Sequence, residues 1–229
     1  MTYALAPHPI PSIPVAGSDL RFAVRRIHCI GRNYADHAAE MGARVDRTQP
    51  IFFSKPADAI VIDDGDVPYP SATGDLHHEV EMVVALAHGG RDIAVAHALE
   101  HVYAYGVGLD LTRRDLQSIA KKNGNPWDTA KGFDHSAPVS ALRRVSDSGH
   151  PPAATQLALE VNGARRQATV LSQMIFSVAE IIHELSKFYE LQSGDLIFTG
   201  TPAGVAALQR GDHFRAELEG WATLTGRVV

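Results

Sequence analysis

The sequence predicts an α+β fold in which short β-strands form most of the core. Apolar, β-branched segments of strand length recur along the chain, and two of them flank Asn162-Gly163, a dipeptide typical of a type I′ hairpin turn. The strongest helical pattern follows a capping box that runs from Ser177 to Glu180. With 229 residues, 45% of them hydrophobic, the chain is long enough to bury one sizeable core.

The composition argues against two classes of partner. The formal net charge is -5 and the basic residues are interspersed, whereas a nucleic-acid or membrane-surface protein would carry a clustered basic face. We therefore expect neither a nucleic acid nor a membrane as a partner. Cys29 is the only cysteine, which excludes an intrachain disulfide and favours a reducing cytoplasm. No apolar run approaches the roughly 18 residues of a membrane span, so we expect a soluble, cytoplasmic protein.

The N-terminal segment is predicted to be a proline-rich extended arm. Residues 1–24 contain Pro7, Pro9, Pro11 and Pro14, a spacing that favours extended backbone over helix. We expect residues 25–229 to form the main domain and the arm to lie on its surface.

A short helix is predicted after a strand at residues 24–30. Asn33 is expected to be its N-cap and Gly42 its C-terminal stop. His37 and Glu40 are three residues apart, so they are neighbours on one face of this helix. A carboxylate beside an imidazole orients it and raises its basicity, as expected of a general base. Surface pairs of this kind are also frequent, so the pair alone leaves both interpretations open.

Two further strands are predicted next in the chain. Residues 50–56 form an apolar run closed by Pro56, and residues 58–62 form a shorter one. Lys55, at the end of the first strand, is either a site residue or a solvated strand end.

The stretch from Gly74 to Leu86 places two carboxylates in an otherwise apolar run. Residues two apart in a strand share a face, so Glu79 and Glu81 project from the same face as His77. Burying two like charges is costly unless a counter-charge is present, and an oxygen-liganded divalent cation supplies one. The alternative is a solvated edge strand with ordinary surface Glu.

A third carboxylate, Asp110, ends the next predicted strand. It has the strand parity of Gly106 and Gly108, and glycine inside a strand often marks close approach of a ligand or of backbone. Three oxygen donors without a thiolate favour Mg²⁺, Mn²⁺ or Ca²⁺ over Zn²⁺. A zinc site that includes His77 is the weaker alternative, because no His-Glu-x-x-His helix or cysteine pair accompanies it.

The residues after Asp110 are predicted to begin a helix. Thr112 to Asp115 has the form of a capping box, and the helix is expected to end by Gly124. Arg114 and Gln117 lie in its first turn, three residues apart. They either contact an anionic substrate or belong to a solvated surface.

The last third of the chain combines hairpins with one helix. Lys131 lies in a mostly uncharged stretch, and residues 143–155 lack periodicity, which predicts a long surface loop. Strands are predicted at residues 157–161, 165–169, 196–199, 213–218 and 221–229. The junction at Gly200 and Thr201 suits close approach of a small anion, although turn geometry alone would also explain it.

Five groups of residues occur in a fixed order along the chain. They are Gly31-Arg32-Asn33-Tyr34 with His37 and Glu40, then His77-x-Glu79-x-Glu81, Leu109-Asp110-x-Thr112-x-Arg114-Asp115-x-Gln117, Ala130-Lys131-x-Phe133 and Gly200-Thr201-Pro202-x-Gly204-Val205. As an ordered set they resemble the fumarylacetoacetate hydrolase family, and within it the short acylpyruvases. The resemblance runs from about Arg25 to the C-terminus.

The resemblance implies a mixed β-roll with peripheral helices, assembled as a homodimer. It also implies Mg²⁺ or Mn²⁺, with Ca²⁺ as a possible occupant, bound by Glu79, Glu81 and Asp110. The implied reaction cleaves a carbon–carbon bond in a β-diketo acid, with fumarylpyruvate as the expected substrate.

The same resemblance implies roles for further residues. The catalytic residues would be His37 oriented by Glu40, which takes a proton from water, and Lys131, which adds positive charge beside the developing enolate. The residues implied in binding the 2-oxo acid are Arg32, Asn33, Arg114, Gln117 and Thr201.

Two alternatives remain open at this point. A metal-dependent oxaloacetate decarboxylase would stabilise the same pyruvate enolate. A non-catalytic binding module would hold a structural metal. The two are told apart by whether the cation is exchangeable and is needed for turnover.

Overall fold

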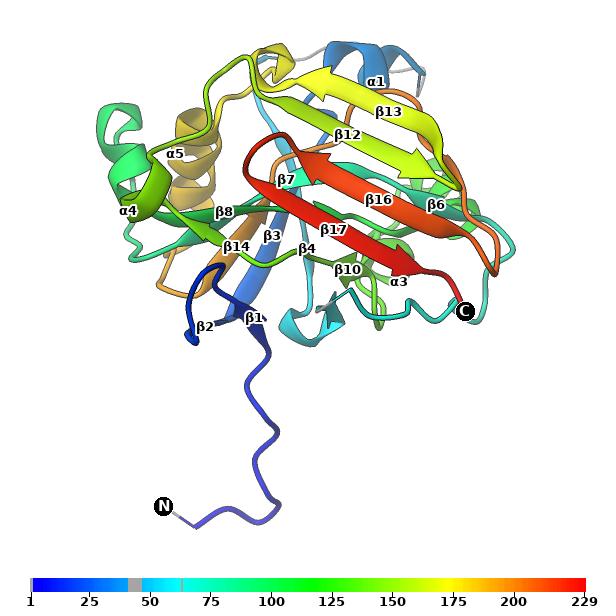
Figure 1. The fold of residues 1–229 in the computed structure, drawn as a ribbon, viewed down its shortest axis with the longest axis horizontal. Helices are drawn as coiled ribbons and strands as arrows, with labels where there is room; N and C mark the ends of the chain where they lie inside the picture. Colours follow the sequence, from blue (N-terminus) through cyan, green and yellow to red (C-terminus); the bar gives the residue numbers. More distant parts are fainter. Residues whose placement is uncertain (1, 41–46, 63) are drawn as a thin grey trace.

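The computed structural model describes residues 2–40, 47–62 and 64–229. The central sheet consists, in spatial order, of β11 (Arg143–Arg144), β8 (Val102–Leu109), β7 (Val80–Leu86), β14 (Asp195–Phe198), β3 (Arg26–Gly31) and β4 (Ile51–Lys55) (Figure 1). Strand β14 runs parallel to β3, and the other neighbouring pairs are antiparallel.

An outer antiparallel sheet covers one face of the central sheet. It consists of β13 (Ala164–Val170), β12 (Gln156–Val161), β16 (His213–Leu218) and β17 (Ala222–Arg227) (Figure 1). Between the sheets, Val80, Met82 and Val84 of β7 belong to one apolar cluster with Leu157 and Leu218. This is the main core, because alternate residues of β7 bury their side chains against the outer sheet.

The opposite face of the central sheet carries a second core. Val83 and Ala85 of β7 pack there with Ile13 and Phe22, which belong to the hairpin of β1 (Ser12–Pro14) and β2 (Arg21–Ala23). Within the predicted arm, residues 2–11 therefore stand off the body (Figure 1), whereas residues 12–23 form this packed hairpin. The division between arm and main domain at residue 24 stays a prediction.

Smaller strand groups and helices complete the fold. Strand β6 (Leu76–His78) lies between β15 (Ala206–Ala207) and β9 (Thr112–Arg113), and β5 (Ile60–Val61) pairs in parallel with β10 (Ala137–Pro138). The helices are α1 (Ala35–Glu40), α2 (Arg114–Asn123), α3 (Asp128–Lys131), α4 (Val145–Ser148) and α5 (Val178–Phe188), with 3-10 turns η1 (Ala57–Ala59), η2 (Val95–His101) and η3 (Leu171–Gln173). The predicted α+β fold, a mixed β-roll with peripheral helices, is confirmed. No helix in the described ranges is long and apolar enough to cross a membrane.

Two local predictions are confirmed in detail. Asn162 and Gly163 both have positive φ angles, 52° and 75°, as a type I′ turn requires. Ser177 caps α5, since its Oγ accepts from the N–H of Glu180 while the Glu180 carboxylate accepts from the N–H of Ser177.

The predicted capping residues of the other two helices are wrong. Asn33 donates to the carbonyl oxygens of Phe176 and Thr199, so its side chain holds a loop rather than the first turn of α1. Thr112 belongs to β9 and donates to the carbonyl of Asp110, and the N-cap residue of α2, Arg113, makes no capping hydrogen bond with its side chain. The partners of Asn33 are 143 and 166 residues away in sequence, which local spacing does not reveal, whereas Thr112 bonds to a carbonyl only two residues before it.

Three boundaries also differ from the predictions. The expected loop at residues 143–155 contains β11 and α4, because β11 pairs with β8 at the edge of the central sheet. The expected strand at residues 58–62 begins as the 3-10 turn η1 and is extended only over β5. The predicted stop of α1 at Gly42 lies outside the described residues, whereas the stop of α2 at Gly124 is confirmed by its left-handed φ of 68°.

Candidate active site

Three buried carboxylates meet at one end of the central sheet. Glu79 and Glu81 flank the first residue of β7, and Asp110 follows β8. The antiparallel register pairs Val80 with Leu109, and the N–H of Asp110 donates to the carbonyl of Glu79 at 2.8 Å. One oxygen from each carboxylate lies within 4.8 Å of the other two, and all three residues are at most 5% exposed. The shared face predicted from residue parity is therefore built by two adjacent strands.

Glu81 and Asp110 provide the observation that tests whether a cation fits. Burial, Asp110 and Glu79 together raise the pKa of Glu81 well above its usual 4.5, and among the described residues its Oε2 accepts only from the N–H of Gly200, at 2.7 Å. Asp110 Oδ1 is buried and makes no hydrogen bond of acceptable geometry, although Lys55 Nζ is 2.9 Å away. Buried carboxylate oxygens with so few hydrogen-bond donors are suited to binding a divalent cation, so the three carboxylates can hold a metal ion.

His77 does not join the clustered carboxylates. Its Nε2 lies 2.9 Å from Asp75 Oδ1, and its Nδ1 accepts from Arg114 Nε at 3.4 Å. Among the residues that the structure describes, the possible metal ligands are all carboxylates, which disfavours the zinc alternative.

Lysine and arginine side chains balance part of this negative charge. Lys131 Nζ donates to Glu79 Oε2 at 2.7 Å and to Asp110 Oδ2 at 2.6 Å, and Arg114 pairs with Glu79 Oε1. Burial alone would raise the pKa of Glu79, but Lys131 and Arg114 hold it below its usual value. Burial would likewise lower the pKa of Lys131, but Asp110 and Glu79 keep it above 10.5. Glu79 is therefore ionised and Lys131 is protonated at neutral pH.

Lys55, which the sequence left open, is buried in this network rather than solvated. Its Nζ pairs with Asp110 Oδ1 at 2.9 Å and donates to the carbonyl oxygens of Leu111, at 3.1 Å, and Lys131. It therefore fastens the end of β4 to the carboxylate cluster and to α3. Arg114 is also buried, and its Nη1 donates to Gln117 Oε1 at 2.5 Å, so the first turn of α2 faces the site.

His37 and Glu40 approach the cluster from α1. His37 Nδ1 lies 3.4 Å from Glu40 Oε2, and both oxygens of Glu40 accept from the N–H of Gly204 at 3.2 Å. A carboxylate only accepts hydrogen bonds, so Nδ1 carries the proton of this contact and Nε2 is the basic nitrogen. Burial lowers the pKa of His37 below 6.5 although Glu79 and Glu40 oppose this, so the ring is neutral at pH 7.

The loop after β14 closes the site. Thr201 is buried and lines the pocket, and its Oγ1 accepts from Gln167 Nε2 at 2.8 Å. Asn33 differs from the other predicted binding residues, because it is directed at the backbone of Phe176 and Thr199 and does not line the pocket. It positions the loop that carries Gly200 and Thr201.

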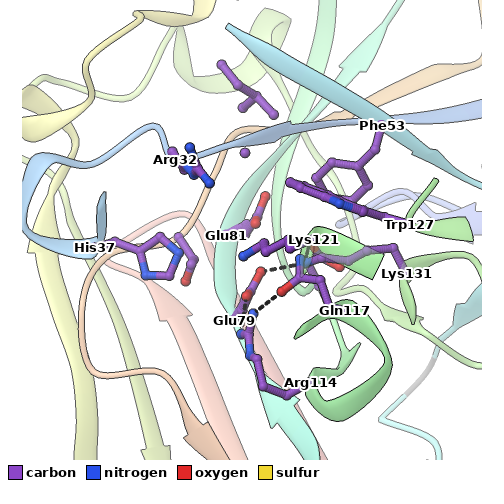
Figure 2. Close-up of a pocket in the computed structure, with 14 residues that line it drawn as sticks. Arg32, His37, Phe53, Glu79, Glu81, Arg114, Gln117, Lys121, Trp127 and Lys131 are labelled. Carbon is purple, nitrogen blue, oxygen red and sulfur yellow. Dashed lines mark hydrogen bonds and ion pairs between the residues drawn. The ribbon is translucent and has the colours of Figure 1, made fainter. Parts of the chain in front are cut away.

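One pocket brings most of the predicted residues together (Figure 2). Its lining consists of Ile30, Gly31, Arg32, His37, Phe53, Glu79, Glu81, Asp110, Arg114, Gln117, Lys121, Trp127, Lys131 and Thr201. Sequence reasoning missed Phe53, Lys121 and Trp127. Two of these had a detectable signal, since Phe53 shares strand parity with Lys55, and Lys121 is four residues after Gln117 on α2. We find no sequence signal for Trp127.

The sequence is similar to a known family of enzymes and to individual proteins over most of its length. The family model described as fumarylacetoacetate (FAA) hydrolase C-terminal matches residues 26–229. The oxaloacetate tautomerase YcgM of Escherichia coli (strain K12) is 39% identical over 213 residues, which cover 93% of this chain and 96% of the relative. The mitochondrial oxaloacetate tautomerase FAHD1 of Rattus norvegicus is 42% identical over 207 residues, covering 89% and 91% respectively.

Solved structures match the whole chain. The crystal structure of fumarylpyruvate hydrolase from Pseudomonas aeruginosa in complex with Mn²⁺ and pyruvate has a TM-score of 0.97 at 46% identity, covering 100% of this chain and 99% of that one. A proposed fumarylpyruvate hydrolase from Burkholderia cenocepacia has a TM-score of 0.93 at 53% identity, covering 100% and 98%.

Proposed function

This chain belongs to the fumarylacetoacetate hydrolase family, and we propose that it is a metal-dependent hydrolase that cleaves a carbon–carbon bond of an acylpyruvate. The proposed substrate is fumarylpyruvate, which gives fumarate and pyruvate. Support comes from the match over the full chain to a fumarylpyruvate hydrolase that binds Mn²⁺ and pyruvate.

The proposed metal ligands are Glu79, Glu81 and Asp110, and the proposed ion is Mg²⁺ or Mn²⁺. When bound there, such an ion would supply Lewis-acid stabilisation of the negative charge that develops on the enolate oxygen of a 2-oxo acid. The buried oxygen atoms of Glu81 and Asp110, which lack sufficient partners, support this assignment.

His37 is proposed as the general base for water. Its neutral ring takes a proton from a water molecule, whose oxygen adds to the distal acyl carbonyl of the substrate. The bond between that carbonyl carbon and the methylene carbon of the pyruvate half then breaks, and its electron pair passes into the pyruvate enolate. Glu40 acts as a positioning residue, since it accepts from His37 Nδ1 and is itself held by the N–H of Gly204.

Lys131 is proposed to stabilise the leaving enolate. It remains protonated beside Glu79 and Asp110, so it holds a positive charge next to the proposed metal ligands. Arg114, Gln117 and Thr201 are proposed to orient the 2-oxo acid end of the substrate, because all three line the same pocket, and Arg32, which also lines it, is a further substrate-binding residue. Pyruvate is released after its enolate carbon is protonated.

One observation carries the proposal: His37, which pairs with Glu40, and the carboxylate cluster line one pocket, with His37 and Lys131 on opposite sides of it (Figure 2). The test is an assay of purified, Mn²⁺-supplemented protein against fumarylpyruvate, acetylpyruvate, fumarylacetoacetate and oxaloacetate in parallel. We expect the highest kcat/KM with fumarylpyruvate and no turnover after chelation. The proposal fails if oxaloacetate or acetylpyruvate exceeds fumarylpyruvate by about tenfold or more, a difference of 1.4 kcal/mol.

Chemistry on oxaloacetate is the second candidate function. Relatives at 39% and 42% identity are oxaloacetate tautomerases, and an oxaloacetate decarboxylase would stabilise the same pyruvate enolate. Hydrolysis alone needs a base for water, so His37→Ala should lower acylpyruvate hydrolysis by about 10²- to 10⁴-fold and lower decarboxylation less. An equal loss of both activities would show that His37 does not act on water specifically.

We also propose that the protein is a cytoplasmic homodimer. The family resemblance supports the homodimer, and the presence of a single cysteine supports the reducing compartment. Light scattering on the purified protein tests the first proposal, and cell fractionation tests the second.

A further inference from the structure

The charges inside the pocket fall into two sets. The first set is the carboxylate cluster with its partners, because Lys55, Arg114 and Lys131 each contact Glu79 or Asp110. These three cations are therefore already engaged. A substrate that brings two negative charges needs positive charge beyond them, of which the metal supplies a part.

The second set consists of Lys121 and Arg32. Both line the pocket, and Figure 2 shows both side chains pointing into it. Within the described ranges, neither forms an ion pair or a side-chain hydrogen bond, and Lys121 Nζ lies over the ring of Trp127, 5.3 Å from its centroid. The backbone of Arg32 is left-handed, with φ 60°, a conformation that is uncommon outside glycine and clusters at functional sites.

The surroundings of Lys121 favour an anion. Burial first, and then the nearby charges of Arg114 and Arg32, lower the pKa of Lys121 to about 8. A half-buried ammonium group among other cations is unfavourable without a counter-ion, and a bound carboxylate would relieve that cost.

Trp127, over whose ring Lys121 Nζ lies, borders a second cavity. The pocket around the carboxylates has a volume of only about 30 Å³, whereas a neighbouring cavity of about 370 Å³ shares Phe53, Trp127 and Lys131 with it. A substrate with its oxo-acid end at the carboxylates therefore has room for its other half along Trp127, where Lys121 lies.

We infer that Lys121, with Arg32, receives a second carboxylate at the far end of the substrate, so that the site selects acylpyruvates whose acyl group ends in a carboxylate. The inference rests on the proposed function only in placing the 2-oxo acid end at the carboxylate cluster. It assigns the pocket's specificity to a lysine on α2 that makes no contact with the proposed metal ligands.

Binding is the first test, because it needs no turnover. Calorimetry on the Mn²⁺-loaded protein compares 2-oxoheptanedioate with 2-oxoheptanoate, two uncleavable acids of equal length that differ in the terminal carboxylate. We expect the diacid to bind about ten- to a hundredfold more tightly, as a hydrogen bond to a charged group provides. Lys121→Met should remove most of this preference and leave the monoacid unaffected, whereas Lys121→Arg should retain much of it.

Two further variants sharpen the comparison. Lys122→Met removes an exposed lysine next in sequence and should leave both affinities unchanged. Arg32→Asn removes the second cation with a residue that tolerates the left-handed backbone, and should weaken diacid binding selectively. The inference is overturned if the wild-type protein binds both acids equally or fails to bind the diacid. It is also overturned if Lys121→Met weakens both acids alike or neither.

Turnover separates this inference from the proposed function. Lys121→Met should lower kcat/KM for fumarylpyruvate by about tenfold or more and leave that for acetylpyruvate unchanged. If the wild-type protein cleaves neither compound, the proposed hydrolase function fails, while the binding comparison still decides the role of Lys121.

Discussion

Glu81 is the residue in the site whose surroundings most require a cation. It is 1% exposed, lies beside Asp110 and Glu79, and contacts no lysine or arginine among the described residues. By contrast, Glu79 is paired with both Lys131 and Arg114. A charge that lacks a protein partner in such a place is neutralised by a proton or by a metal ion.

We predict that Glu81→Gln weakens Mn²⁺ binding by about a hundredfold or more. Loss of a group that only hydrogen-bonds to a metal ligand already weakens metal binding by about ten- to a hundredfold. The amide oxygen can still accept from the N–H of Gly200, so the loop should stay in place while one negative charge is lost. Titration calorimetry with Mn²⁺ on metal-free protein measures the effect. Glu219→Gln, at an exposed position, is the control, and an unchanged Mn²⁺ affinity in folded Glu81→Gln would refute the assignment.

We predict that kcat/KM falls on the acid side with a pKa below 6.5. The neutral imidazole of His37 is the active form, burial lowers its pKa, and the rate is lost only as the pH drops through that lowered value. Glu40 raises the pKa of His37 through its hydrogen bond and its charge, so Glu40→Gln should move the acid limb to still lower pH. The pH profiles of the two proteins provide the test, and an acid limb that shifts upward in Glu40→Gln would contradict it.

Residue spacing in the sequence revealed some site residues and not others. Glu79, Glu81 and Asp110 were predictable because strand parity places carboxylates on one face beside an apolar run. Lys121 was not recognised, because a lysine near the end of an exposed helix looks like any solvated residue until Trp127 and Arg32 are placed beside it.

At the scale of elements, the loop after β14 connects fold to site. Its Gly200 has φ 93°, and a Cβ there would lie 2.6 Å from Cβ of Asn33. The same glycine donates its N–H to Glu81, so backbone conformation, close packing and the position of a proposed metal ligand depend on one residue.

We predict that Gly200→Ala destabilises the fold and weakens Mn²⁺ binding together. Gly211 is a matched control, since its φ of 91° is nearly the same but a Cβ there would meet nothing within 4 Å. Gly211→Ala should cost about 1–2 kcal/mol of backbone strain and leave kcat/KM unchanged. Gly200→Ala should cost about 1–3 kcal/mol more, because overpacking is added. Urea unfolding and Mn²⁺ calorimetry measure both, and equal effects of the two variants would exclude the packing argument.

Elements held by local contacts were predictable, and elements held by distant contacts were not. The capping box of α5 and the turn at Asn162 use neighbouring residues only, so their sequence signals suffice. Asn33 has the same type of signal, but its side chain bonds to the carbonyl of Thr199, 166 residues away. A polar side chain can bond to its own helix or to a buried backbone group that would otherwise lack a partner. Sequence spacing does not show which buried groups lack one.

At the scale of the whole molecule, β14 joins the two halves of the central sheet. It pairs in parallel with β3 and antiparallel with β7, which are more than a hundred residues away in sequence, and no local pattern encodes such a pairing. Its first residue, Asp195, is fully buried. It accepts from Arg25 Nη1 at 3.0 Å and from the N–H of Gln192 at 2.9 Å, and His28 Nε2 lies 3.8 Å away.

We predict that Asp195 makes global stability fall in acid. Burial alone would raise the pKa of Asp195, but the nearby His28 and the hydrogen bonds from Arg25 and Gln192 together hold it below the usual 3.8. A carboxyl group with a depressed folded-state pKa stabilises the fold fully above the unfolded-state value, and that contribution disappears as the pH falls through the folded-state value.

Asp195→Asn should therefore lower the free energy of unfolding by about 1–3 kcal/mol near neutral pH, since it removes hydrogen bonds to a charged group. The difference from wild type should stay constant down to about pH 5 and shrink below 3.8, the usual pKa of the group. Urea unfolding followed by tryptophan fluorescence across this range measures it. Asp19→Asn, at an exposed position of the β1–β2 hairpin, should show no such difference. A deficit in Asp195→Asn that persists unchanged at the lowest pH would mean that the lost stability is packing rather than charge.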